Sequence, residues 1–194
     1  MAEEYEPGAI SRKVTEARAK KGREFNVRGS ADVVAVIVAT GFGAGFAPVA
    51  PGTFGSLVGA LIFYGLMIAF RFEPQRLQIS VLAASVVSAV IGTWASTRAE
   101  KIFAKKDAQQ IVIDEVCGQL IAFAFVAPFL VKIGGLWRWM TLAGFVLFRF
   151  FDIFKPYPIR RLEALGSGLG VMADDILAGI YAAIVLSSLL LLLP

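Results

Sequence analysis

The sequence predicts an all-α fold, a multi-helical integral membrane protein with about four to five hydrophobic spans. Three observations support this. Of the 194 residues, 57% are hydrophobic and only 18% are charged, whereas soluble domains carry about 25% charged residues. The apolar residues gather in runs about as long as a bilayer-spanning helix. The basic residues gather in the segments that separate alternate runs.

A polar, basic tail of residues 1–30 precedes a membrane-embedded region over residues 31–194. The tail has no apolar run typical of a signal peptide. Residues 11–24 have the spacing of a short amphipathic helix, and its basic side chains would favour anionic lipid. A solvated, frayed tail is the alternative.

Five apolar runs are candidates for spanning helices. They cover residues 54–72, 77–96, 116–136, 137–154 and 176–194. The fourth run contains Arg149 and Asp152, which we place at its cytoplasmic end. Residues 31–47 are also apolar but are interrupted by three glycines, so we expect a short dipping or buried helix there.

The basic residues predict the orientation. With a cytoplasmic N-terminus and five alternating spans, fifteen of the 19 Lys and Arg residues lie on the cytoplasmic side, as the positive-inside rule requires. This orientation also brings every cluster of Gly, Pro and carboxylate to that side. The opposite loops contain one acid, Glu73. We therefore predict a catalytic face at the cytoplasmic interface.

Two absences limit the chemistry of this face. The chain has no His, and Cys117 is its only Cys. An internal disulfide, a His- or Cys-based zinc site and a His-dependent catalytic triad are therefore excluded. Carboxylates, hydroxyls, Lys, Arg, backbone groups and a hard metal ion remain.

A Gly- and Pro-rich segment over residues 41–57 precedes the first long apolar run. Thr53 and Ser56 are residue types that cap helices. A Gly-rich turn that leads into a helix exposes N–H groups and favours an anion. A break between two membrane helices, without a ligand, explains the same pattern.

Two pairs of adjacent acids, Asp114 with Glu115 and Asp174 with Asp175, each open an apolar helical run. Compensation of the helix dipole explains one acid at such a position better than two. Ionisable groups at a membrane edge favour a functional interpretation. If helical, Asp174 and Asp175 point about 100° apart, so that one faces the site while the other caps or ligates from the edge.

A third block follows the fourth apolar run. Asp152 and Lys155 lie three residues apart, before Pro156 and Pro158 stop the helix. A local ion pair at a helix end is the simpler explanation. Lys155, Arg160 and Arg161 form a basic group that would face lipid headgroups or a phosphate. Three carboxylate sites beside Lys, Arg and N–H groups predict a hard cation such as Mg²⁺ together with a phosphate.

In order, the blocks GFGAGFAPVAPGTFGSL, DAQQIVIDEVCGQL, FRFFDIFKPYPI and GLGVMADDILAG resemble the phosphatidylglycerophosphatase A family over roughly residues 31–185. The resemblance implies an all-helical, membrane-embedded phosphatase domain in the bacterial inner (cytoplasmic) membrane. It implies Mg²⁺-dependent removal of the terminal phosphate of phosphatidylglycerophosphate, which gives phosphatidylglycerol in glycerophospholipid biosynthesis. The partner would be a phospholipid in the membrane, not a nucleic acid.

The resemblance and the residue patterns together give three groups of candidate site residues. The catalytic group is Asp114, Glu115, Asp152, Lys155, Asp174 and Asp175. The metal ligands are drawn from Asp114, Glu115, Asp174 and Asp175. The phosphate-binding group is Gly52, Thr53, Gly55, Ser56, Lys155 and Arg160.

Several alternatives remain open from the sequence. Attack by a metal-activated water and formation of an aspartyl-phosphate are both compatible with these residues. A small membrane transporter or channel subunit that uses interface carboxylates is the rival function. A non-catalytic membrane scaffold, with the acids as caps only, is the third. The sequence does not give the oligomeric state.

Overall fold

The structure, a computed structural model, describes residues 27–162 and 167–192. The described part is helical and contains no strand, which confirms the predicted all-α class. The amphipathic segment expected over residues 11–24 lies outside the described residues.

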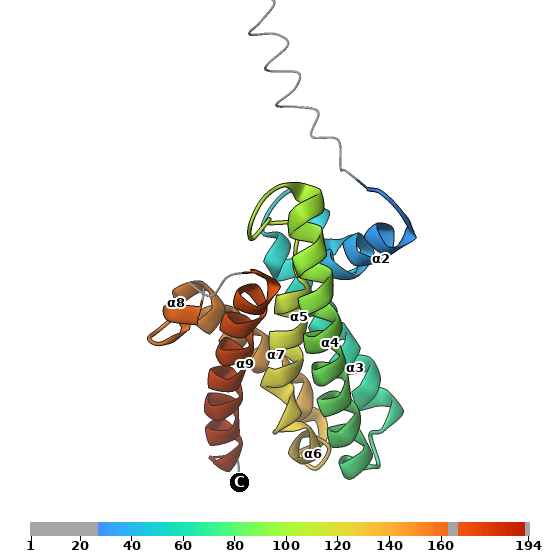
Figure 1. The fold of residues 1–194 in the computed structure, drawn as a ribbon. Coiled ribbons are helices and arrows are strands. Elements are labelled where there is room, and N and C mark those ends of the chain that lie inside the picture. The colour runs from blue at the N-terminus through green and yellow to red at the C-terminus, as the bar shows by residue number, and fades with distance from the viewer. Residues whose placement is uncertain (1–26, 163–166, 193–194) are drawn as a thin grey trace, which may run out of the picture.

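Figure 1 shows the long helices arranged around a shorter central one. The elements are α2 (Ser30–Ala39), η1 (Ala44–Phe46), α3 (Pro51–Ala69), α4 (Pro74–Phe103), α5 (Ile113–Ala124), α6 (Ala127–Leu130), η2 (Gly134–Leu136), α7 (Trp137–Phe154), α8 (Ile159–Leu162) and α9 (Ser167–Leu191). The central α5 packs against α3, α4, α7 and α9, and nearly all of its residues are buried. Its first turn is therefore surrounded by other helices.

Among the described residues, three helices have the length and composition needed to cross a membrane: Pro51–Ala69, Pro74–Phe103 and Gly168–Leu191. This is fewer than the four to five spans expected. The run 116–136 is not one helix, because α5 ends at Ala124 and α6 is a short separate helix that begins at Ala127. Pro128 and the Gly134–Gly135 pair explain the breaks. The run 137–154 does form one helix, α7, but it carries three charged residues.

The short helix expected within residues 31–47 is α2, and it ends just before the Gly-rich turn. Backbone bonding ties this turn to the start of α5, since the Val112 N–H donates to the Ala39 carbonyl at 2.8 Å. The loop from α4 to α5, the end of α7 and the start of α9 lie at the same end of the bundle (Figure 1).

The core lies between α3, α4 and α5. Phe63 and Phe123 stack there with ring centroids 4.2 Å apart, and Leu77 and Leu120 are fully enclosed. Large apolar side chains also cover the outer faces of the long helices, as Leu61 and Val86 do. An apolar exterior of this kind is stable in lipid and costly in water.

Candidate active site

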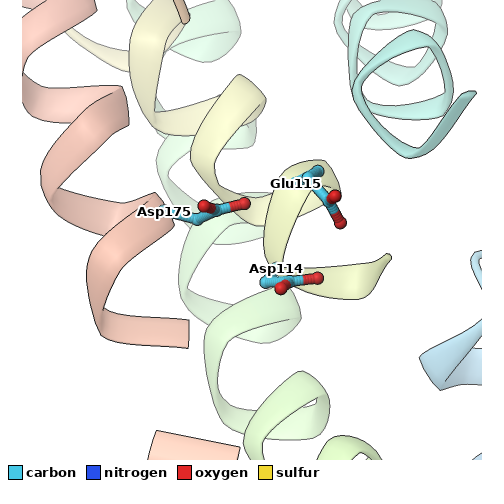
Figure 2. Close-up of side chains that lie close together, drawn as sticks. All are labelled: Asp114, Glu115 and Asp175. Atoms are coloured by element: carbon cyan, nitrogen blue, oxygen red, sulfur yellow. The ribbon is translucent and has the colours of Figure 1, made fainter. Parts of the chain in front are cut away.

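Three carboxylates meet where α5 and α9 pack together (Figure 2). Asp114 and Glu115 come from the first turn of α5, and Asp175 comes from α9. One oxygen from each residue lies within 4.8 Å of the others. Asp114 is only 8% exposed and Asp175 only 3%. We call these three residues the carboxylate trio.

Facing glycines bring the trio together. Gly118 lies one turn after Asp114, and a Cβ on it would lie 2.6 Å from the Asp175 carbonyl oxygen and 2.5 Å from the Phe148 ring. On α9, a Cβ on Gly179 would run into the Gly118 carbonyl oxygen. Glycine at both positions therefore lets the two backbones approach closely.

The trio concentrates negative charge in a poorly solvated place. Burial raises the pKa of Asp114 well above its ordinary value, and the neighbouring charges of Glu115 and Asp175 raise it further. Burial also raises the pKa of Glu115, to about 7. Within the described residues, Asp114 Oδ1, Glu115 Oε2 and Asp175 Oδ2 are buried without a hydrogen-bond partner. Unpartnered, buried carboxylate oxygens are costly unless a cation or a proton compensates them.

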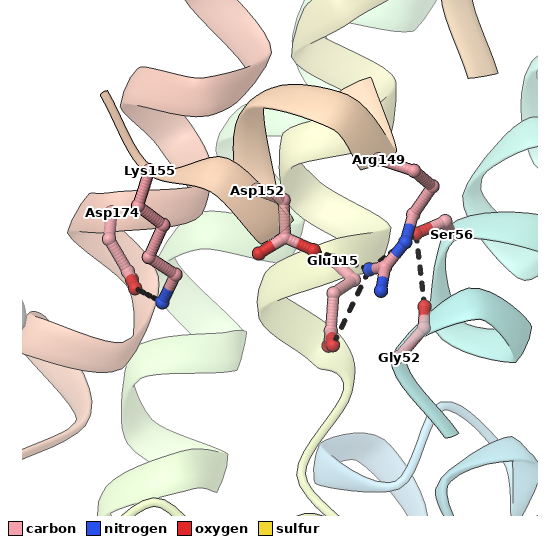
Figure 3. A network of polar contacts seen from close by, with 7 residues as sticks. All are labelled: Gly52, Ser56, Glu115, Arg149, Asp152, Lys155 and Asp174. Atoms are coloured by element: carbon pink, nitrogen blue, oxygen red, sulfur yellow. Dashed lines mark hydrogen bonds and ion pairs between the residues drawn. The ribbon is translucent and has the colours of Figure 1, made fainter. Parts of the chain in front are cut away.

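Arg149 of α7 forms a second, adjoining network (Figure 3). Its Nη1 donates to Asp152 Oδ2 at 2.5 Å and to the Ser56 hydroxyl at 3.3 Å. The same nitrogen lies 3.9 Å from Glu115 Oε1. The Ser56 hydroxyl donates to the Gly52 carbonyl at 3.0 Å. One guanidinium thus links α3, α5 and α7.

Asp174 has a different partner from its neighbour Asp175. Its Oδ2 accepts a hydrogen bond from Lys155 Nζ at 2.6 Å (Figure 3). Lys155 caps the C-terminal end of α7 in the left-handed region, with φ 42°. The structure therefore places Asp174 with Lys155 rather than in the trio.

Both networks open into one cavity of about 650 Å³. Six acids line it, namely Asp107, Asp114, Glu115, Asp152, Asp174 and Asp175. Three bases line it as well: Lys106, Arg149 and Lys155. When ionised, this excess of acids would repel an incoming phosphate, and a bound cation would reverse that effect.

The predicted phosphate-binding residues of the Gly-rich block are only partly at the cavity. Gly52 lines it, and a Cβ on Gly52 would run into Glu115 Oε1. Gly55 instead packs against Val112, whose Cβ would lie 2.7 Å from a Cβ on the glycine. Ser56 is buried beneath Arg149, and Thr53 is not among the lining residues.

The capping role expected for Thr53 and Ser56 is wrong. Helix α3 begins at Pro51, with Ala50 as its N-cap, so both residues lie inside the helix. Proline fixes φ and lacks an N–H, which makes the first helical position its preferred one. Arg160, the remaining predicted residue, is exposed on α8 and does not line the cavity.

Arg149 is the cavity-lining residue of the candidate site that sequence reasoning missed. The signal was present, because Arg149 and Asp152 lie three residues apart in an otherwise apolar run. A charge inside such a run is costly, so it usually has a partner and a role. The contact with Ser56, 93 residues away in the chain, appears only in the folded structure.

Comparison with known proteins identifies the family. A model of the family described as phosphatidylglycerophosphatase A matches residues 37–190. The chain belongs to this family. It is therefore a lipid phosphatase, and its apolar helices make it a membrane protein. The transporter and scaffold alternatives are therefore set aside. All four motif blocks lie within the matched residues.

Two curated relatives carry the name of this family. The chain is 37% identical to phosphatidylglycerophosphatase A of Haemophilus influenzae over 150 residues, which cover 77% of this chain and 84% of the relative. It is 36% identical to phosphatidylglycerophosphatase A of Escherichia coli (strain K12) over 148 residues, which cover 76% and 78%.

A third relative has a different name. It comes from Bacteroides thetaiotaomicron and is named, provisionally, as a phosphatidylinositol-3-phosphatase. It is 36% identical over 152 residues, which cover 78% of this chain and 91% of the relative. No solved structure matches the chain significantly.

Proposed function

We propose that this lipid phosphatase hydrolyses the terminal phosphate of phosphatidylglycerophosphate in a Mg²⁺-dependent reaction. The product would be phosphatidylglycerol, and the role would lie in glycerophospholipid biosynthesis. The carboxylate trio is the observation that carries this proposal, because its buried oxygens lack partners and open into a cavity. Two relatives named for this activity support the choice of substrate.

The donor set suits Mg²⁺. This ion prefers oxygen ligands, and protein sites commonly combine one or two carboxylates with water and substrate phosphate oxygens. Asp114, Glu115 and Asp175 would hold it. When bound there, Mg²⁺ would polarise the phosphoryl group and make water a better nucleophile.

The remaining residues orient and neutralise the phosphate. Lys155 lines the cavity, and Asp174 holds its ammonium group in place at 2.6 Å. Arg149 keeps the Asp152 carboxylate paired beside the trio. The first N–H group of α3 is that of Gly52 on the cavity wall, because Pro51 has none, and an N–H group at a helix start favours an anion. Fixed charges and donors of this kind supply most of the catalysis in phosphoryl transfer.

The α7 side of the cavity offers a place for the acyl chains. Ile153 lines the cavity yet is 66% exposed, and Phe154 next to it is also exposed. A lipid whose phosphate enters the cavity would lay its chains along this apolar face. We propose that the site faces the cytoplasm from the bacterial inner membrane, in agreement with the basic segments of the sequence and the bacterial relatives.

Phosphate release by the purified chain from three lipids tests the substrate. The lipids are phosphatidylglycerophosphate, phosphatidylinositol 3-phosphate and phosphatidic acid, each in mixed micelles with Mg²⁺. We expect the highest kcat/KM for phosphatidylglycerophosphate. A higher value for phosphatidylinositol 3-phosphate would assign the chain the activity named for the Bacteroides relative. Release from none of the three would contradict the proposal.

An acid quench during turnover separates the two chemical routes. Labelled phosphate that stays on the protein would indicate a carboxylate nucleophile. Direct entry of oxygen from ¹⁸O-labelled water into phosphate, with no label on the protein, would indicate attack by water. Asp152→Asn tests whether Asp152 is the carboxylate nucleophile, because the Asp152 carboxylate lines the cavity.

A further inference from the structure

A second cavity lies between α4 and the segment that contains Arg28 and the start of α2. Helix α2 lies at the same end of the bundle as the start of α9 (Figure 1). The volume of the cavity is about 740 Å³. Arg28, Asp32, Trp94, Arg98 and Lys101 are among its lining residues, and it shares none with the catalytic cavity. We call it the α2–α4 groove.

The α4 wall of the groove changes from apolar to basic along the helix. Val90, Trp94, Arg98 and Lys101 recur at helical spacing, so they lie on one face of α4. The rise from Val90 to Lys101 is about 16 Å. Val90 and Trp94 are well exposed, at 67% and 42%. An aromatic ring between an apolar stretch and a basic end is typical of a membrane–water interface.

The basic end has more positive than negative charge. Asp32 is its one acid among the lining residues, and it is already bound by Arg98 Nε at 2.5 Å. The backbone N–H of Arg28 also donates to Asp32, at 2.7 Å. These two contacts hold the pKa of Asp32 below its ordinary value, so it stays charged and fixes Arg98. Arg28, Arg98 and Lys101 therefore give the basic end three positive charges against the one negative charge of Asp32.

The groove is placed to meet lipid. Helix α4 is long and apolar enough to span a membrane. Helix α2 turns Asp32 and Ala35 inward and exposes Val33, Val34 and Ile37. Apolar side chains of this kind on a short helix beside a spanning helix are expected to contact acyl chains.

We propose that the α2–α4 groove binds an anionic phospholipid, as a site separate from the active site. The headgroup phosphate would lie at the basic end beside Lys101, and one acyl chain would follow Trp94 and Val90 toward the membrane interior. Basic pockets between membrane helices bind anionic headgroups in this way. The proposal does not depend on which lipid the active site hydrolyses.

Quenching of Trp94 fluorescence tests this assignment. The full chain is placed in phosphatidylcholine nanodiscs that contain a small fraction of lipid with brominated chains, either phosphatidylserine or phosphatidylcholine. The part of the quenching that Trp94→Phe removes reports the groove. We expect stronger quenching by brominated phosphatidylserine than by brominated phosphatidylcholine. The affinity for phosphatidylserine should fall about five-fold in Lys101→Gln and also in Arg28→Gln. Lys105 is a matched exposed lysine outside the groove, so Lys105→Gln should leave the affinity for phosphatidylserine unchanged.

Equal quenching by the two lipids would overturn the proposal. A loss of phosphatidylserine affinity in Lys105→Gln as large as in Lys101→Gln would overturn it as well. A phosphatidylserine preference that appears only after removal of residues 1–26 would overturn it too, because the chain's own tail would then fill the groove. If the variants do not fold, the wild type still gives a test. Its preference must weaken between about 0.05 M and 0.5 M salt, since salt screens charge at a membrane surface, and a salt-independent preference contradicts the proposal.

Discussion

Asp174 and Asp175 are adjacent in α9, yet their carboxylates have different partners. Asp175 belongs to the trio with Asp114 and Glu115, whereas Asp174 bonds to Lys155. Neighbouring residues in a helix point about 100° apart, which predicted two environments from sequence. Helical spacing did not predict which acid would face which partner, because that depends on how α9 packs against α5 and α7.

The two acids are therefore expected to respond differently to amide substitution. Asp175→Asn should lower kcat at least about 100-fold, because it removes an oxygen from the proposed cation site. Asp174→Asn should cost about ten-fold, because it loosens only the hold on Lys155. Steady-state phosphate release, with melting curves to confirm folding, makes the comparison. A fully active Asp175→Asn enzyme would contradict the site.

Glu115 gives a prediction for stability against pH. Burial raises its pKa from the ordinary 4.5 to about 7, so between these values the folded protein holds a proton that the unfolded chain releases. The contribution of Glu115 to stability is therefore fully present below pH 4.5 and is lost as the pH rises through 7. In EDTA, the melting temperature should fall between pH 5 and pH 8, and Mg²⁺ should restore it most at pH 8.

Glu115→Gln is the control for this titration, because it removes the group without a large change in shape. Its melting temperature in EDTA should vary less with pH than that of the wild type. Differential scanning fluorimetry in detergent measures both proteins. A wild-type melting temperature that rises from pH 5 to pH 8 would show that Glu115 is ionised in the metal-free protein.

At the scale of elements, the start of α3 shows why its glycines matter. Gly52 lies on the cavity wall against Glu115, whereas Gly65 in the same helix has no atom within 4 Å of its would-be Cβ. Gly52→Ala should therefore displace Glu115 and Arg149 and lower kcat about 10- to 100-fold.

Gly65→Ala is the matched control in the same helix. It should keep full activity and stabilise α3 by about 0.5–1 kcal/mol. Steady-state kinetics and thermal melting of both variants measure these effects on activity and stability. Equal kinetics for the two variants would show that the approach of α3 to Glu115 is not needed for activity.

The sequence predicted a long helix well at α4, where one apolar run has no interruption. The start of α9 was predicted wrongly, because the helix begins at Ser167 and Asp174 and Asp175 lie inside it rather than open it. It failed over residues 116–136, where hydrophobicity suggested one span and the structure has α5, a turn and α6. Average hydropathy does not register Pro128 or the Gly134–Gly135 pair, although both have physical reasons to end a helix. The central position of α5 was also not predictable, because it arises from contacts with four other helices.

At the scale of the whole molecule, the order of the four motif blocks identified the family, and the structure explains why blocks far apart in the chain form one site. Helices α3, α5, α7 and α9 each bring one block to the same end of the bundle. Residue types and local spacing predicted most members of the site. Arg149 as its central cation, and the exclusion of Arg160 and Thr53 from the cavity, required the tertiary structure.

The orientation of the molecule is testable with single cysteines, because Cys117 is fully buried. Phe72 lies in the turn between α3 and α4 and is 81% exposed, and Lys105 lies beyond the other end of α4. In intact bacterial cells, Phe72→Cys should react with a membrane-impermeant maleimide. Lys105→Cys should react only after the inner membrane is opened. The reverse pattern would place the active site on the outer side.

The central claim is that the carboxylate trio hydrolyses phosphatidylglycerophosphate with the help of a divalent cation. The most direct measurement is phosphate release from this lipid by purified wild-type protein, first in EDTA and then after addition of Mg²⁺. Our account predicts no release in EDTA, full recovery with Mg²⁺, and little release by Asp175→Asn under either condition. A full rate in EDTA, or an inactive wild type with Mg²⁺, would contradict it.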